Sequence, residues 1–147
     1  MKKLLVLSAA VLGIFFTSCS SDDDDSGNPL IGSWGFFQDE NANGELEEGD
    51  ECSKKLTLIF REDMSFELEA YGSITGDPDE CEKDSDSDTG TCAILSEGLL
   101  AITYSEGDVE QGMYSIDGNT LTIINEYESN GETETERSIY IRKLIDH

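Results

Sequence analysis

The chain has 147 residues, a length that suits one domain, and its 33 Asp and Glu against 9 Lys and Arg give a formal net charge of −24 at pH 7. This balance argues against a nucleic-acid partner, because nucleic-acid binding needs clustered Lys and Arg, and it suits cations, basic partners or simple solubility. The single histidine is the last residue, His147, which excludes a histidine-based catalytic triad or zinc site.

The chain begins with a segment typical of a bacterial lipoprotein signal. Lys2 and Lys3 precede an apolar run over residues 4–16, which is too short to span a bilayer but fits the core of a secretion signal. Cys19 follows small residues at the end of this run, where a lipoprotein signal places the thiol that takes up the lipid. We therefore predict a signal peptide over residues 1–18 and a membrane partner reached through a lipid anchor on Cys19. A plain secretory signal with an incidental cysteine is the alternative.

Residues 19–29 predict a flexible, acidic tether behind the anchor. Four consecutive aspartates, residues 22–25, lie among small residues that cannot bury apolar surface. An acidic run directly after a lipidated cysteine also resembles the surface-export signals of Bacteroidota lipoproteins. The resemblance implies an outer-membrane location with exposure at the cell surface, and a mere spacer facing the periplasm is the alternative.

From Leu30 onward the apolar residues alternate with polar ones, as in Phe66 and Leu68 around Glu67, and this period of two predicts strands. Eight strands are expected, at residues 30–38, 53–60, 65–72, 92–97, 99–104, 111–116, 120–128 and 133–143. Short strands in sequence favour an all-β fold, an eight-stranded antiparallel meander closed into a barrel over residues 30–147.

The connections predict two different barrel ends, because hairpins of a meander alternate between the ends. Tight turns at residues 61–64, 97–98 and 117–119 fall at one end, where the tether also enters the first strand. The other end receives longer and mostly acidic loops. We expect these loops to form a rim that faces away from the membrane.

Several of these residues resemble the lipocalin-like domains of Bacteroidota lipoproteins. Gly32-Ser-Trp34 is similar to the Gly-x-Trp signature of lipocalins, and residues 56–66 and 112–123 are similar to strand-turn-strand units of these domains. The resemblance implies a lipocalin-like barrel in which Trp34 plugs the closed end. It implies a fold more than an activity, since most members lack an assigned function.

Residues 39–50 match the spacing of a Ca²⁺-binding loop, with Asp in place of the usual Glu at the twelfth position. Gly44 would allow the sharp bend, and Leu46 would tuck into the core. The expected ligands are Asp39, Asn41, Asn43, Glu45 through its carbonyl, and Asp50. The cofactor prediction is therefore calcium, and a solvated acidic loop is the alternative.

Three cysteines, Cys52, Cys81 and Cys92, remain beyond the lipidated one, and an exported chain can keep one disulfide among them. We favour a disulfide between Cys81 and Cys92, which would close the long acidic loop, over one from Cys52 to either partner. A catalytic cysteine would lack a histidine to activate it. Carboxylate pairs such as Glu134 and Glu136 are interpreted as solvent-facing, so no enzymatic activity is expected.

The sequence thus predicts a lipid-anchored binding module that holds a small molecule in the barrel mouth or a protein partner on the rim. The alternative is an accessory surface lipoprotein whose barrel is filled by its own side chains. An eight-stranded barrel can be either, because its interior is just wide enough for its side chains or for one small ligand. A connected apolar cavity would favour the binding module.

Overall fold

The structure is a computed structural model that describes residues 27–41, 43–77 and 79–144. The predicted signal peptide, the lipidated Cys19 and most of the predicted tether therefore lie outside the described residues. In the part of the chain that is described, no helix has both the length and the apolar character needed to cross a membrane.

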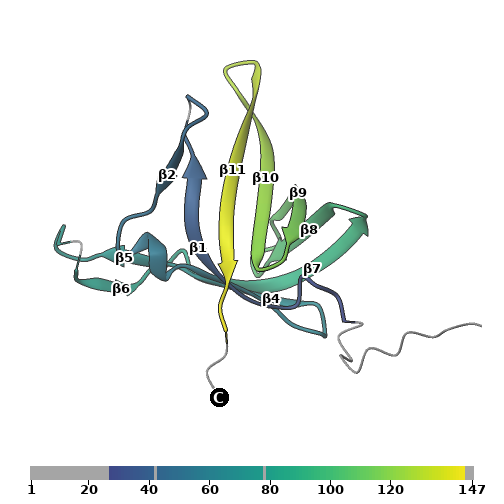
Figure 1. Cartoon of the computed structure of the whole chain (residues 1–147), viewed down its shortest axis with the longest axis horizontal. Coiled ribbons are helices and arrows are strands. Elements are labelled where there is room, and N and C mark those ends of the chain that lie inside the picture. Colours follow the sequence, from purple (N-terminus) through teal and green to yellow (C-terminus); the bar gives the residue numbers. More distant parts are fainter. Residues whose placement is uncertain (1–26, 42, 78, 145–147) are drawn as a thin grey trace, which may run out of the picture.

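Strands make up nearly all of the regular structure in the described residues, together with one short 3-10 helix (Figure 1). The elements in chain order are β1 (Gly32–Glu40), β2 (Leu46–Glu48), the 3-10 helix η1 (Ser53–Lys55), β3 (Thr57–Phe60), β4 (Ser65–Glu69), β5 (Tyr71–Ser73), β6 (Cys81–Lys83), β7 (Asp88–Ser96), β8 (Leu99–Tyr104), β9 (Val109–Asp117), β10 (Thr120–Ser129) and β11 (Glu132–Arg142).

Eight of these strands close into an antiparallel barrel. Their order is β11-β10-β9-β8-β7-β4-β3-β1, and β11 also pairs with β1, which completes the ring. Each barrel strand pairs with the next barrel strand along the chain, so the predicted all-β, eight-stranded antiparallel meander is confirmed. Outside the ring, β2 pairs with the far end of β1, and β5 and β6 form a separate two-stranded sheet.

Alternation along the strands places one set of side chains inside the barrel and the other outside. The buried cluster consists of Leu30, Trp34, Leu58, Phe60, Phe66, Cys92, Leu100, Leu121 and Ile123. The rings of Phe60 and Phe66, on neighbouring strands, lie 5.2 Å apart between centroids. Both the closed ring and this core are formed within residues 27–144, so this part of the chain is a complete folding unit.

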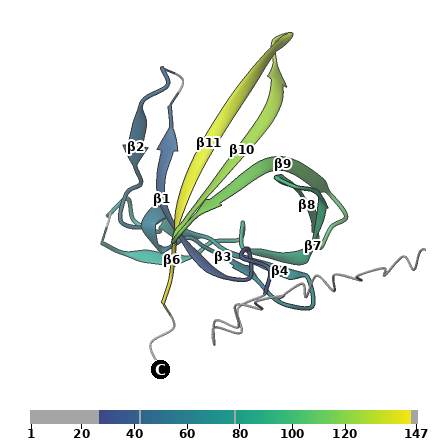
Figure 2. The same ribbon diagram turned by 45° about the vertical axis from the view of Figure 1, so that its right-hand side comes forward.

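The two ends of the barrel differ, as the turn pattern predicts. Short turns join β3 to β4, β7 to β8 and β9 to β10 at the end where β1 begins and β11 stops. The opposite end receives the long connections that carry β2, η1, β5 and β6. There, contrary to expectation, the β10–β11 connection is also tight: Asn130 and Gly131 have φ values of +53° and +82°, which suits a two-residue hairpin turn. The β10–β11 hairpin consequently extends beyond the ring as a two-stranded ribbon (Figure 2).

Three barrel strands differ from the prediction by more than two residues at one end. The strand expected at residues 53–60 begins only at Thr57, because Ser53–Lys55 form η1. The next barrel strand ends at Glu69, since the chain then leaves the ring to pair β5 with β6. The strand expected from residue 92 begins at Asp88, where its first residues pair with β4.

Candidate ligand-binding site

Trp34 lies at the tight-turn end of the barrel and is fully buried, with an exposed fraction of 0%. Its indole N–H donates a hydrogen bond of 2.9 Å to the carbonyl of Leu30. The guanidinium of Arg142 lies 4.1 Å from the centre of the indole ring, a cation–π arrangement, and it also donates to the carbonyl of Ile31 at 3.0 Å. These contacts close this end, so a ligand would have to enter from the other one.

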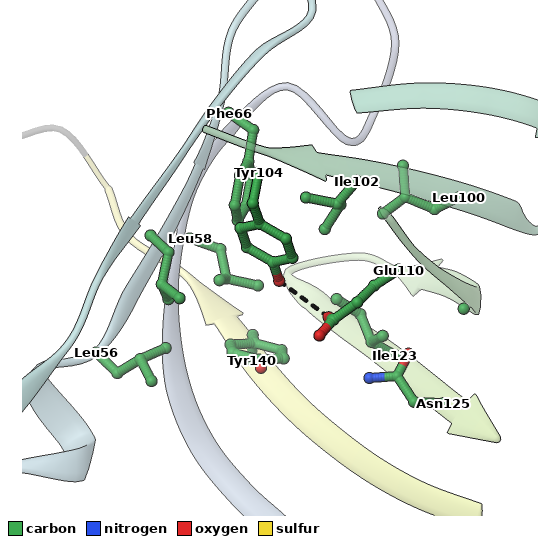
Figure 3. A pocket seen from close by; sticks show the side chains of 12 residues that line it. Leu56, Leu58, Phe66, Leu100, Ile102, Tyr104, Glu110, Ile123, Asn125 and Tyr140 are labelled. Atoms are coloured by element: carbon green, nitrogen blue, oxygen red, sulfur yellow. Dashed lines mark hydrogen bonds between the residues drawn. The ribbon is translucent and has the colours of Figure 1, made fainter. Parts of the chain in front are cut away.

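Above the packed core, the end with the long connections holds a cavity of about 180 Å³ (Figure 3). Half of the lining residues are Leu or Ile, and Phe66 of the buried core adds an aromatic ring. Four lining residues carry polar groups: Tyr104, Glu110, Asn125 and Tyr140. An apolar cavity of about 150 Å³ is large enough to bind benzene, so this cavity could hold a small molecule. The barrel interior is thus packed at one end and hollow at the other.

A tyrosine–glutamate pair forms the polar part of the cavity wall. The hydroxyl of Tyr104, at the end of β8, donates a hydrogen bond of 2.9 Å to Glu110 Oε2 on β9 (Figure 3). Burial raises the pKa of Tyr104 well above its usual value, and the hydrogen bond to Glu110 raises it further. Burial likewise raises the pKa of Tyr140 on β11. Both phenols therefore stay neutral at physiological pH, while a carboxylate can accept further hydrogen bonds beyond the one from Tyr104.

The projecting β10–β11 hairpin adds carboxylates on the side of the mouth. Glu136 pairs in register with Asn125, a cavity-lining residue. Because alternate residues share a face, Glu134 and Glu136 lie on the same face of β11 as Tyr140. Both are exposed, as their interpretation as solvent-facing residues predicts, and the face of β11 that carries them is the one that carries Tyr140. Glu136 and Glu110 line a common hollow beside the main cavity.

The predicted calcium ligands lie along the β1–β2 hairpin, where several of their oxygens accept backbone hydrogen bonds. Asn41 Oδ1 accepts from the N–H groups of Asn43 and Glu45 at 3.0 and 2.9 Å. The Glu45 carbonyl accepts from the Asn41 N–H at 2.8 Å, and Asp50 Oδ1 accepts from the Ser53 N–H at 2.7 Å. Within the described residues, no three His, Cys, Asp or Glu side chains gather as a metal-binding group. Calcium binding stays a prediction.

Other residues of the same segment have distinct environments. Gly44 adopts a φ of +80° at the bend, as a glycine can without strain. Leu46 is 46% exposed, and the prediction that it packs in the core is wrong because β2 lies outside the ring. Asp39, on β1, has a buried Oδ1 that finds no hydrogen-bond partner among the described residues.

The disulfide joins Cys52 to Cys81, so the predicted pairing of Cys81 with Cys92 is wrong. Cys92 lies on β7 inside the barrel core, where it is 5% exposed and free. Burial raises the pKa of its thiol. Cys52 and Cys81 instead meet outside the ring, and their bond ties the β5–β6 hairpin to the segment that leads to Leu56 in the cavity wall.

The sequence prediction did not single out the polar residues of the cavity. Their positions nevertheless follow from the period of two, because Tyr104 and Asn125 lie an even number of residues after the buried Leu100 and Ile123 on the same strands. Counting from core residues toward the mouth would have placed both inside the barrel. Their mutual proximity could not be read in this way, since it depends on the register between strands.

No protein-family model matches the chain, and a search of curated proteins finds no match. The resemblance to lipocalin-like lipoproteins therefore stays a prediction. The function has to be argued from the cavity and its surroundings.

Proposed function

We propose that the protein is a lipid-anchored binding protein of the cell envelope that holds a small, mostly apolar molecule in the mouth of its barrel, without catalysing a reaction. The observation that carries the proposal is the cavity of about 180 Å³ above the packed core. Dense packing is the rule in protein interiors, and an apolar hollow without ligand sacrifices contact energy. A bound apolar group would restore these contacts.

The size of the cavity limits the ligand. Sites for drug-sized molecules usually measure about 300–1,000 Å³, so this one suits a small ring or a short alkyl chain whose remainder extends into the mouth. Leu58, Leu100 and Ile123 would contact the apolar part, while the polar groups lie nearer the opening. The ligand class is thus a small molecule with an apolar portion and a polar end.

The proposed location follows from the N-terminal segment and the orientation of the barrel. A lipid on Cys19 would hold the protein on the outer membrane through the acidic tether. Since β1 begins at the closed end, the tether would attach there and the mouth would face outward. Replacing Cys19 with Ser should release the protein from the membrane fraction or leave its signal uncleaved. Unchanged membrane partitioning of the processed variant would contradict the lipid anchor.

A titration with 1-hexanol, followed by ¹H–¹⁵N NMR, tests the binding function on residues 20–147, which include the complete folding unit. We expect saturable shifts of the amides around the cavity. Ile102→Trp, which fills the cavity, should abolish them. The matched variant Ile141→Trp changes an outward side chain that is 39% exposed and should retain them.

Absence of saturable binding, or equal binding by the two tryptophan variants, would contradict the proposal. The accessory role with a self-filled barrel would then be the better explanation, since the closed half of the barrel is already packed around Trp34. Mass spectrometry of small molecules that copurify with the protein would identify the natural ligand.

A further inference from the structure

The polar groups of the cavity have one electrostatic character. Glu110 is an ionisable carboxylate in the wall, and no Lys or Arg is among the described residues that line the cavity. Tyr104 donates a hydrogen bond from its hydroxyl to Glu110. Both Tyr104 and Tyr140 are neutral, so their rings add no positive charge to the wall. Aromatic faces attract cations, and carboxylates accept charge-assisted hydrogen bonds from them.

Carboxylates from three strands lie around the mouth: Glu110 and Glu136 line one hollow beside the cavity, and Asp39 lines another. Burial raises the pKa of Tyr140 most, a hydrogen bond with Ser138 lowers it, and the negative charges of Asp39 on β1, Glu136 on β11 and Glu110 on β9 raise it further. Their combined field at the mouth attracts a cation and repels an anion.

The buried oxygen of Asp39 gives an independent indication of a missing partner. Asp39 Oδ1 is shielded from solvent and accepts no hydrogen bond from the described residues. A buried carboxylate oxygen without a donor is destabilising. Asp39 lies in a hollow that adjoins the main cavity, with which it shares Leu56. A cationic group at the mouth would supply donors on this side.

Two basic side chains of the end with the long connections pair with other carboxylates. Arg137 pairs with Glu40 at 3.3 Å, and Lys83 pairs with Glu69 at 3.3 Å. Among the ion pairs of the described residues, none involves Asp39, Glu110 or Glu136. A cationic ligand at the mouth would therefore meet carboxylates that form no ion pair of their own among the described residues.

We propose that the cavity selects a small organic cation, such as an amine with a short apolar body, whose apolar part packs against Leu100 and Ile123 and whose charged group lies at Glu110. This inference rests on the proposed binding function and names the class of its ligand. The ammonium donates hydrogen bonds to the free lone pairs of Glu110 and lies near the rings of Tyr104 and Tyr140.

Three probes with the same alkyl chain separate this inference from the binding function itself. Hexylamine, 1-hexanol and hexanoate are titrated into residues 20–147 at pH 7 and fixed ionic strength. Hexylamine should bind about tenfold more tightly than 1-hexanol, as expected for one charge-assisted hydrogen bond, and hexanoate should bind most weakly. Similar affinities for all three would overturn the cation preference while leaving the binding function in place. No binding of any probe would overturn both.

A charge variant tests the assignment to Glu110. Glu110→Gln keeps an acceptor for Tyr104 but removes the charge, so the affinity for hexylamine should fall about tenfold, to that of 1-hexanol measured on the same variant. The matched control is Glu97→Gln, which removes one charge in the β7–β8 turn at the opposite end. Equal effects of the two substitutions would mean that net charge attracts the amine, and would overturn the site assigned here.

Discussion

The disulfide between Cys52 and Cys81 should supply a large part of the stability of the barrel. The two cysteines are separated by 29 positions in sequence, and closing a loop of this length removes conformational entropy from the unfolded chain. In the chain-entropy relation, a loop of this size corresponds to about 3.6 kcal/mol at 25 °C. A domain of this size typically has a free energy of unfolding of about 5–15 kcal/mol, so losing the bond should be readily measurable.

Urea denaturation of residues 20–147 measures this contribution in the Cys52→Ala/Cys81→Ala double variant. With a denaturant slope of about 1.5 kcal/mol/M, the unfolding midpoint should fall by about 2 M. Each single variant also breaks the bond, so either alone should lose nearly as much stability as the double variant. Cys92→Ala serves as the comparison that removes a cysteine without touching the cross-link.

Alkylation of the oxidised protein checks the pairing directly. Because Cys92 is buried in the core, it should react only after denaturation, while Cys52 and Cys81 should require a reductant as well. A peptide linking Cys81 to Cys92 would refute the pairing. A loss below about 1 kcal/mol in the double variant, well under the range expected for a native disulfide, would refute the entropic reasoning.

Three further perturbations test other parts of the structure. Gly90→Ala should destabilise the barrel by about 2–3 kcal/mol, because the added Cβ would collide with a backbone carbonyl of β8; Gly27→Ala, in open space, should be neutral in the same urea assay. Since the pKa of Tyr104 is raised on folding, its stabilising contribution is complete below the unfolded pKa of about 10 and is lost as pH rises further. Urea midpoints above pH 10 should therefore fall less steeply for Tyr104→Phe than for the unchanged protein, and parallel profiles would contradict this. Calcium binding predicts that millimolar Ca²⁺ raises the Tm more than Mg²⁺ or matched NaCl does, with about 1.4 kcal/mol of stabilisation when free Ca²⁺ is in about tenfold excess over Kd. Replacing Asp39 and Asp50 with Asn should remove this difference. Equal shifts with all three salts would contradict a metal site.

The strands could be predicted because their signal is local. In β4, Phe66 and Leu68 point inward and Glu67 points outward, and this alternation is visible in the sequence without knowledge of any neighbour. The order of the strands followed from their short connections, since a meander is the simplest path between them. The first residues of β3 and β7 were harder to predict, because the start of β3 depends on the η1 turn and the start of β7 depends on pairing with β4.

Features that depend on non-local geometry could not be predicted. Cys81 is nearer in sequence to Cys92 than to Cys52, but the side chain of Cys92 points into the core and is out of reach. The calcium-loop motif specifies which residue types occupy which positions. It does not specify whether the backbone brings their oxygens around one ion. In this segment, β1 pairs with β2, Asn41 and Asp50 accept hydrogen bonds from backbone N–H groups, and calcium binding stays a prediction.

The barrel separates the residues that hold it together from those proposed to bind a ligand. At the closed end, Trp34 and its neighbours bury apolar surface, and the indole N–H and both terminal nitrogens of Arg142 donate hydrogen bonds to backbone carbonyls. At the mouth, Glu110 lines the main cavity and Asp39 lines an adjoining hollow, and no Lys or Arg is among the described residues that line either. Such an arrangement opposes folding through charge repulsion, and the packed closed end would offset this cost. A cation at the mouth would relieve this repulsion, and by linkage its binding would stabilise the folded barrel.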